Sequence, residues 1–241
     1  MISQGRNSHG RGRGRQRGGG FGFISSKESQ RHRGIELSLC LQLFGGQNGG
    51  FNSRSALLSS TQSQEAAEKI EQIHNQALML AANSQELLQE YLKYQGEPFG
   101  QPGIIPAQME VPGLPSPVIS QEAWLSFSNA ERLRQNYVAY AVLPGFLLQV
   151  RRWQEDLNPI ASELLGLLEK SAKQTLGLQS NLASLLKTLG FLVPLVSPPP
   201  APEASSAFLQ KLLGWRICQD YQDWLHRTER DFTVLAQRYP L

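Results

Sequence analysis

The side chains best suited to chemistry in this chain are four histidines, two cysteines and one closely spaced acidic pair. The histidines are His9, His32, His74 and His226. Their separations match no metal-ligand spacing, and His74 and His226 are expected to be ordinary residues on helix surfaces. Asp220 and Asp223 have a helical spacing, for which a solvated face is the expected environment. The sequence therefore predicts a protein that is not an enzyme and uses no metal or cofactor.

The cysteines and glycines lead to the same conclusion. Cys40 and Cys218 cannot form a disulfide framework, so the fold must depend on its core. Cys218 lies beside predicted core residues, which favours a buried and inert thiol over a nucleophile. The run RGRGRQRGGG at 11–20 resembles a phosphate-binding loop only in composition, because no strand pattern precedes it.

Two residues with a different kind of chemistry, Phe208 and Lys211, lie one helical turn apart near the end of the chain. An exposed aromatic ring at a rigid helix end offers apolar contact area to a partner, and a neighbouring Lys adds charge at the rim. Taken alone, this spacing is more typical of a Phe that covers the end of a helix bundle.

The element that positions these two residues is a helix predicted over 206–239. Its apolar side recurs at steps of three and four residues. That side consists of Ile217, Tyr221, Trp224, Thr228, Phe232 and Leu235. Either Ser205 or Ser206 can cap the start. At 1.5 Å per residue the helix is about 50 Å long, so it needs equally long partners.

Three other segments show the same periodicity, and helices are expected over 63–95, 128–157 and 160–189. Gly96 should end the first of them. Ser128 and Glu131 form a capping-box pattern before the second, within which Pro144 should introduce a kink. The alternative, that Pro144 splits this helix, fits less well because the periodicity resumes at once. Asn158 is expected to cap the third helix.

The lengths of the connections decide the topology. Two residues, Asn158 and Pro159, join the second and third helices, which must therefore be antiparallel neighbours. The links 96–120 and 191–204 are long enough to return along a helix of about 45 Å. The sequence thus predicts an all-α, up-up-down-down four-helix bundle over 61–241, the connectivity of the growth hormone and cytokine bundles.

The charge is concentrated in the N-terminal segment. Residues 1–55 carry nine Lys/Arg and two Asp/Glu, whereas the rest of the chain has a net charge of −4. Gly- and Arg-rich composition predicts a disordered tail over 1–60. An alternative function follows, that of an intracellular RNA-associated protein acting through this tail. A set of lipid-binding helices is disfavoured because the polar faces are not strongly basic.

Membrane insertion and a conventional export signal are not predicted. No apolar run approaches the roughly 18 residues of a membrane span. The first thirty residues lack a secretory signal pattern, and the one candidate run, 35–44, is short and contains Glu36.

Four segments carry a resemblance to a known family. LLQEYLKYQGEPFGQPG at 87–103, NAERLRQNY at 129–137 and RRWQEDLNP at 151–159 resemble stretches of the cardiotrophins. The most specific segment, FLQKLLGWRICQDYQDWLHRTERDF at 208–232, resembles their last helix. The resemblance covers about residues 62–239. The cardiotrophins are long-chain four-helix cytokines of the interleukin-6 family.

The resemblance implies a secreted, monomeric ligand that joins glycoprotein-130 to the leukaemia inhibitory factor receptor and signals through Janus kinases and STAT factors. In that family a Phe-x-x-Lys motif docks the leukaemia inhibitory factor receptor, and Phe208 and Lys211 carry it here. The glycoprotein-130 contact uses exposed faces of the first and third helices. The need for a third, specificity-setting receptor stays open, and no nucleic-acid partner is expected. Cardiotrophins commonly lack a conventional signal peptide, so secretion remains the expectation.

Overall fold

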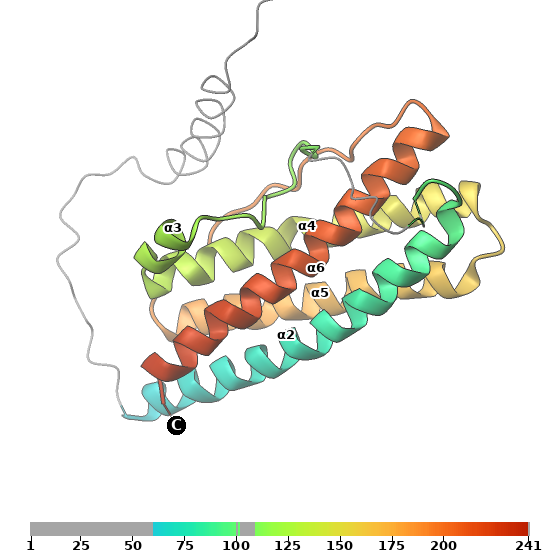
Figure 1. Cartoon of the computed structure of the whole chain (residues 1–241). Coiled ribbons are helices and arrows are strands. Elements are labelled where there is room, and N and C mark those ends of the chain that lie inside the picture. Colours follow the sequence, from blue (N-terminus) through green and yellow to red (C-terminus); the bar gives the residue numbers. More distant parts are fainter. Residues whose placement is uncertain (1–59, 100, 102–108, 241) are drawn as a thin grey trace, which may run out of the picture. The chain divides into compact units, whose positions relative to one another are not determined.

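The computed structural model describes residues 60–99, 101 and 109–240, and all its regular structure is helical. The helices are α2 (Ser60–Gln95), α3 (Gln121–Ser126), α4 (Asn129–Leu157), α5 (Ser162–Thr188) and α6 (Ala207–Arg238). Residues 1–59 of the predicted tail, including the apolar run 35–44, lie outside this described part, whereas Ser60 is the first residue of α2. The predicted all-α class is confirmed (Figure 1).

The four long helices form an up-up-down-down bundle, as predicted. Each of α2 and α4 packs against both α5 and α6. The ends of α2 and α4 meet where Gln95 Nε2 donates to Gln154 Oε1 at 3.0 Å, so these helices are parallel. The start of α2 meets the end of α5 where Lys69 Nζ donates to Thr188 Oγ1 at 2.8 Å, so this pair is antiparallel. Figure 1 shows α6 running in the direction of α5.

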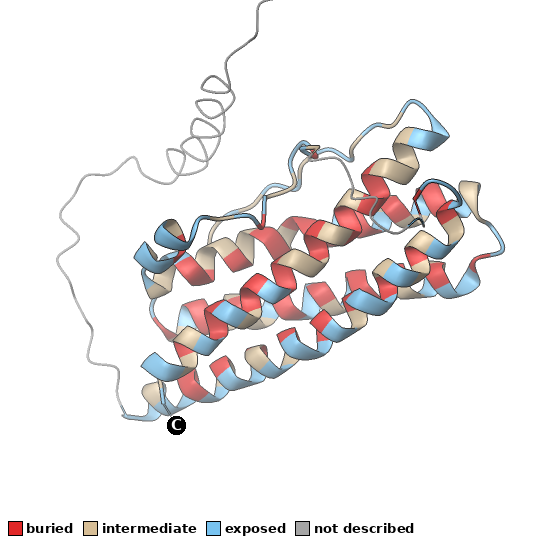
Figure 2. Ribbon diagram, in the orientation of Figure 1, coloured by how far each residue is buried: buried red, intermediate tan, exposed pale blue. Residues whose placement is uncertain are grey.

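The core consists of the apolar sides that the periodicity predicts (Figure 2). All six residues of the predicted α6 stripe are buried. In α2 the buried apolar side extends from Ala66 to Tyr91, after which Gln95 is buried and Tyr94 is only partly covered. Trp153 on α4 is also buried, so it serves packing as Trp224 does.

Several predicted helix signals are confirmed. The hydroxyl of Ser128 accepts from Glu131 N while the Glu131 carboxylate accepts from Ser128 N, which completes the capping box. Ser206, not Ser205, caps α6 by accepting from Leu209 N at 3.2 Å. Helix α4 continues through Pro144, so the alternative of two separate helices is wrong.

Two helix starts differ from their predictions. Helix α2 begins at Ser60, three residues early, and α5 begins at Ser162 instead of residue 160. The prediction that Asn158 caps the third helix is wrong. The Asn158 N–H donates to Gln154 O at 2.8 Å, so Asn158 is the C-cap of α4. The Asn158 carbonyl accepts from Ala161 N in the turn that follows. That turn places Pro159 outside both helices.

The described parts of the two long links lie over the bundle (Figure 1). Trp224 Nε1 donates to Pro115 O at 2.8 Å, which fastens the first link to α6. The links also approach each other, because a Cβ on Gly113 would lie 2.5 Å from Pro199 Cβ. Gly113 has φ +80°, so glycine meets both a steric and a conformational need there. None of the described helices is long and apolar enough to cross a bilayer.

Candidate functional site

Phe208 lies in the first turn of α6 and is 58% exposed. Its ring centroid is 5.5 Å from that of Phe99, which is buried in the link that follows α2. Phe99 in turn meets the buried Trp215 edge-on, with the centroids 5.9 Å apart. The three rings form a continuous cluster of tilted and edge-on contacts that begins in the core and ends at the surface. Phe208 therefore packs on a buried ring while most of its own surface stays exposed.

Lys211, one turn further along α6, has quite different surroundings. Its ammonium donates to the carbonyl of Gln95 at 2.7 Å, and its side chain is partly buried. Gln95 is the last residue of α2, and Gly96 follows it with φ +70°. The Lys211 charge thus satisfies an orphan carbonyl at the negative end of the α2 dipole. The sequence predicted a charge at the rim of a docking surface, whereas this hydrogen bond joins α6 to α2.

Tyr91 makes a second contact between these helices. Its hydroxyl donates to the backbone carbonyl of Lys211 at 2.8 Å, and burial raises the pKa of Tyr91 well above its usual range. A Cβ on Gly214 would lie 2.3 Å from the Tyr91 hydroxyl oxygen, so α6 can approach Tyr91 only because residue 214 has no side chain. Sequence periodicity did not reveal this contact, since it does not show where two helices come closest.

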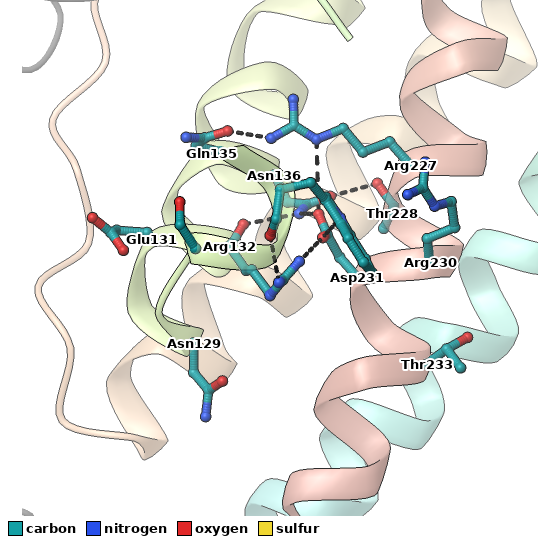
Figure 3. Close-up of polar contacts among 12 residues, drawn as sticks. Asn129, Glu131, Arg132, Gln135, Asn136, Arg227, Thr228, Arg230, Asp231 and Thr233 are labelled. Carbon is teal, nitrogen blue, oxygen red and sulfur yellow. Dashed lines mark hydrogen bonds and ion pairs between the residues drawn. The ribbon is translucent and has the colours of Figure 1, made fainter. Parts of the chain in front are cut away.

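A fully buried carboxylate, Asp231, organises the opposite end of the bundle (Figure 3). Its Oδ1 accepts from Arg132 Nη1 at 2.7 Å and from Trp124 Nε1 at 2.8 Å. Its Oδ2 accepts from Asn136 Nδ2 at 2.7 Å. These donors come from α3 and α4, so one side chain of α6 connects three helices. Sequence reasoning missed this cluster because polar residues beside an apolar stripe look like surface residues.

Two arginines also pack against the indole of Trp124, which connects α3 to α4 and α6. The guanidinium of Arg132 lies 4.4 Å from the Trp124 ring and that of Arg230 lies 4.5 Å from it. Arg132 Nη2 further donates to the Trp124 backbone carbonyl at 2.6 Å. These cation–π contacts and hydrogen bonds hold a six-residue helix that is too short to be stable alone.

The predicted solvated pair Asp220 and Asp223 divides into two environments, and the prediction is wrong for Asp220. Asp220 is 4% exposed, and its Oδ2 accepts from Arg216 Nε on the same helix at 3.1 Å. Its Oδ1 forms an ion pair with Arg216 Nη2 at 2.7 Å. Burial raises its pKa to about 6, although Arg216 acts in the opposite direction. Asp223 is partly exposed and accepts from Gln219 at 3.0 Å.

The raised pKa of Asp220 predicts a pH-dependent stability. The folded protein keeps this proton up to about pH 6, whereas the unfolded chain loses it near pH 3.8. Between these values the folded state binds more protons, so the stability contributed by Asp220 is largest at low pH and falls until about pH 6. Urea unfolding should show the wild type losing stability relative to Asp220→Asn over this range. Parallel pH profiles of the two proteins would contradict the assignment.

The remaining candidates offer no reactive arrangement. His226 is exposed and His74 is partly buried near Thr233 on α6. Cys218 is buried, and burial raises the pKa of its thiol far above the usual value, which confirms an inert thiol. Across the described residues, no group of three or more His, Cys, Asp or Glu side chains could hold a metal ion.

The comparisons with known proteins agree on one family. The family model for plethodontid receptivity factor matches residues 57–240. Cardiotrophin-1 of Mus musculus is 40% identical over 176 residues, which cover 70% of this chain and 85% of the relative. Cardiotrophin-1 of Homo sapiens is 40% identical over 173 residues, covering 69% and 85%. Cardiotrophin-2 of Mus musculus is 33% identical over 175 residues, covering 72% and 86%.

These matches confirm the resemblance drawn from the four sequence segments. The match to the family model extends across all the described helices, from α2 to α6. The relatives are cytokines and not enzymes, which agrees with the inert thiol and the scattered histidines. The chain therefore belongs to the plethodontid receptivity factor family and is a cytokine homologue of the cardiotrophins.

Proposed function

We propose that this protein is a secreted cytokine that binds glycoprotein-130 and the leukaemia inhibitory factor receptor and brings them together. Their approach would activate receptor-associated Janus kinases and STAT transcription factors. The homology to the cardiotrophins supports the class of partner. The observation that carries the proposal is the exposed ring of Phe208, held on a buried aromatic base at the start of α6.

The leukaemia inhibitory factor receptor would dock at the end of the bundle that carries Phe208 and Lys211. An aromatic side chain with two rotatable angles loses little entropy on binding, and Phe99 already restricts this one. Glycoprotein-130 would dock on exposed faces of α2 and α5. Two separate surfaces on one monomer allow one ligand to hold two receptors at the same time.

Binding of the full chain to the two receptor ectodomains tests this proposal. Each ectodomain is immobilised separately, and each resulting complex is then offered the other receptor. We expect both receptors to bind and each first complex to capture the second receptor. A sample that shows the circular dichroism of a helical bundle but binds neither receptor would overturn the proposal.

A further inference from the structure

We propose that Ser197 is an acceptor site for mucin-type O-glycosylation, in which a transferase attaches N-acetylgalactosamine to the serine hydroxyl. Ser197 lies in the second link, 191–204, which joins α5 to α6. This modification takes place in the secretory pathway, so its use in cells rests on the proposed secretion. The suitability of Ser197 as an acceptor rests on the structure of the link.

The most exposed residues of the second link recur at every third position. Leu192 and Leu195 are 76% and 87% exposed, and Pro198 and Ala201 continue the series. The residues that follow them are partly covered, and none of the link is buried (Figure 2). Three residues per turn is the period of a polyproline II helix, which the five prolines of the link favour. The pattern therefore indicates an extended segment that a modifying enzyme can bind from outside.

The backbone of the second link is open to such an enzyme. Phe191 N donates to Leu186 O at 2.8 Å, but no backbone hydrogen bond joins 192–202 to another described residue. Side chains hold the link in place instead, because Val193 and Val196 pack against the core. A transferase must bind the residues around its acceptor hydroxyl. In this link it would not have to break a helix or a turn to reach them.

The Ser197 hydroxyl is available for reaction. Ser197 is exposed, and its hydroxyl makes no hydrogen bond to another described residue. Three prolines, 198–200, follow it directly, and serine among prolines is typical of O-glycosylated segments. No charged residue occurs between Lys187 and Glu203. A neutral sugar suits this segment better than a phosphate, which would find no Lys or Arg partner within it.

Ser116 in the first link is the matched serine for comparison. It is also exposed and is also followed by a proline, Pro117. However, its Oγ accepts from Val118 N at 3.2 Å, and Pro117 is buried. An enzyme that bound this segment would have to break that hydrogen bond and remove Pro117 from its packing. The structure therefore distinguishes two serines that have the same neighbour in the sequence.

The transfer is a substitution at the sugar. The Ser197 oxygen forms a bond to the anomeric carbon of uridine diphosphate N-acetylgalactosamine, while the bond from that carbon to the diphosphate oxygen breaks. Uridine diphosphate leaves, the hydroxyl proton passes to the departing diphosphate, and nothing is oxidised or reduced. The product has added polar surface in a link where Leu192 and Leu195 are exposed.

Transfer to the purified full chain tests whether Ser197 is an acceptor. Protein made in bacteria is incubated with uridine diphosphate N-acetylgalactosamine and a polypeptide N-acetylgalactosaminyltransferase, and its intact mass is measured. We expect wild type, Ser116→Ala and Ser197→Thr each to gain one N-acetylhexosamine, and Ser197→Ala to gain none. A folded wild type that gains no sugar would overturn the proposal, and so would equal reaction of Ser197→Ala.

Protein collected from the medium of mammalian cells that express the full chain shows whether the site is used. We expect fragmentation of the peptide that contains Ser197 to place an N-acetylhexosamine, alone or extended by further sugars, on this residue. Secreted wild type that carries no sugar there, or a phosphate instead, would overturn the proposal and leave the proposed secretion intact. If no protein reaches the medium, the proposed secretion fails and use of the site in cells fails with it. The transfer experiment still decides in that case whether Ser197 is an acceptor.

Discussion

Replacing Asp231 by Ala should lower the free energy of unfolding by about 3–5 kcal/mol, the range for breaking a buried ion pair by removing one partner. Arg132 is 1% exposed and would be left without its carboxylate, while Trp124 and Asn136 would each lose an acceptor. Water cannot readily replace these partners at a fully buried position. Urea unfolding followed by circular dichroism measures the loss.

Asp223, eight residues earlier on α6, provides the matched control. It lies on the same helix but is partly exposed and accepts one hydrogen bond from Gln219. Asp223→Ala should change the free energy of unfolding by less than about 1 kcal/mol. The double replacement Arg132→Met with Asp231→Leu should recover part of the loss, because Arg132 no longer remains as an unpaired buried charge. Arg227, which is 6% exposed and whose Nε lies 3.9 Å from Asp231 Oδ2, still loses its carboxylate. A loss below about 1 kcal/mol for Asp231→Ala would contradict the structural role of the cluster.

Replacing Gly214 by Ala should destabilise the fold by about 2–3 kcal/mol, although Ala has the higher helix propensity. The new Cβ would lie 2.3 Å from the Tyr91 hydroxyl oxygen and 2.9 Å from the ring carbon that bears it. Tyr91 cannot easily withdraw, because its ring is fully buried and its hydroxyl donates to Lys211 O. The helices α2 and α6 must therefore move apart at the end that carries Phe208.

Gly166→Ala, also within a long helix, should have the opposite effect on stability. Gly166 lies within α5, and a Cβ there would meet no atom within 4 Å. This substitution should stabilise the protein by about 0.5–1 kcal/mol, because it reduces the freedom of the unfolded chain. Thermal unfolding of both variants measures the contrast. If Gly214→Ala also proved stabilising, the close approach of α6 to Tyr91 would be wrong.

The features that sequence alone predicted are those encoded within single helices. Regular spacing identified the four long helices and their buried sides, and local capping patterns identified Ser128 and narrowed the cap of α6 to Ser205 or Ser206. Connection lengths then restricted the topology, because a two-residue joint cannot return along a long helix. Each of these inferences needs only the neighbours of a residue along the chain.

The features that were missed depend on which helices meet. The single-helix pattern of Asp220 is that of a surface residue, yet in the bundle it is buried. Asn158 could either end α4 or begin α5. In the structure its N–H donates to Gln154 O, so it ends α4, which was not predicted. Lys211 had the spacing of a recognition residue, but only the packed structure shows that its ammonium contacts the end of α2.

The two ends of the bundle have different tasks in this account. Around Asp231 the polar groups contact one another and hold α3, α4 and α6 together. Around Phe208 the polar groups fix the backbone of α2 and α6, and an aromatic ring stays open at the surface. The end around Asp231 thus stabilises the fold, and the end around Phe208 presents a preorganised, exposed ring. This division suits a ligand that a partner recognises without rearrangement of the bundle.

The most direct test of the docking surface compares wild type with Phe208→Ala on the two immobilised receptors, measured separately with full-length protein. We expect binding to the leukaemia inhibitory factor receptor to weaken about 30-fold, corresponding to a hot spot of about 2 kcal/mol, and glycoprotein-130 binding to stay unchanged. Leu125→Ala, which removes a 61% exposed side chain on α3, should leave both unchanged. Wild-type affinity of a folded Phe208→Ala for the leukaemia inhibitory factor receptor would contradict the account.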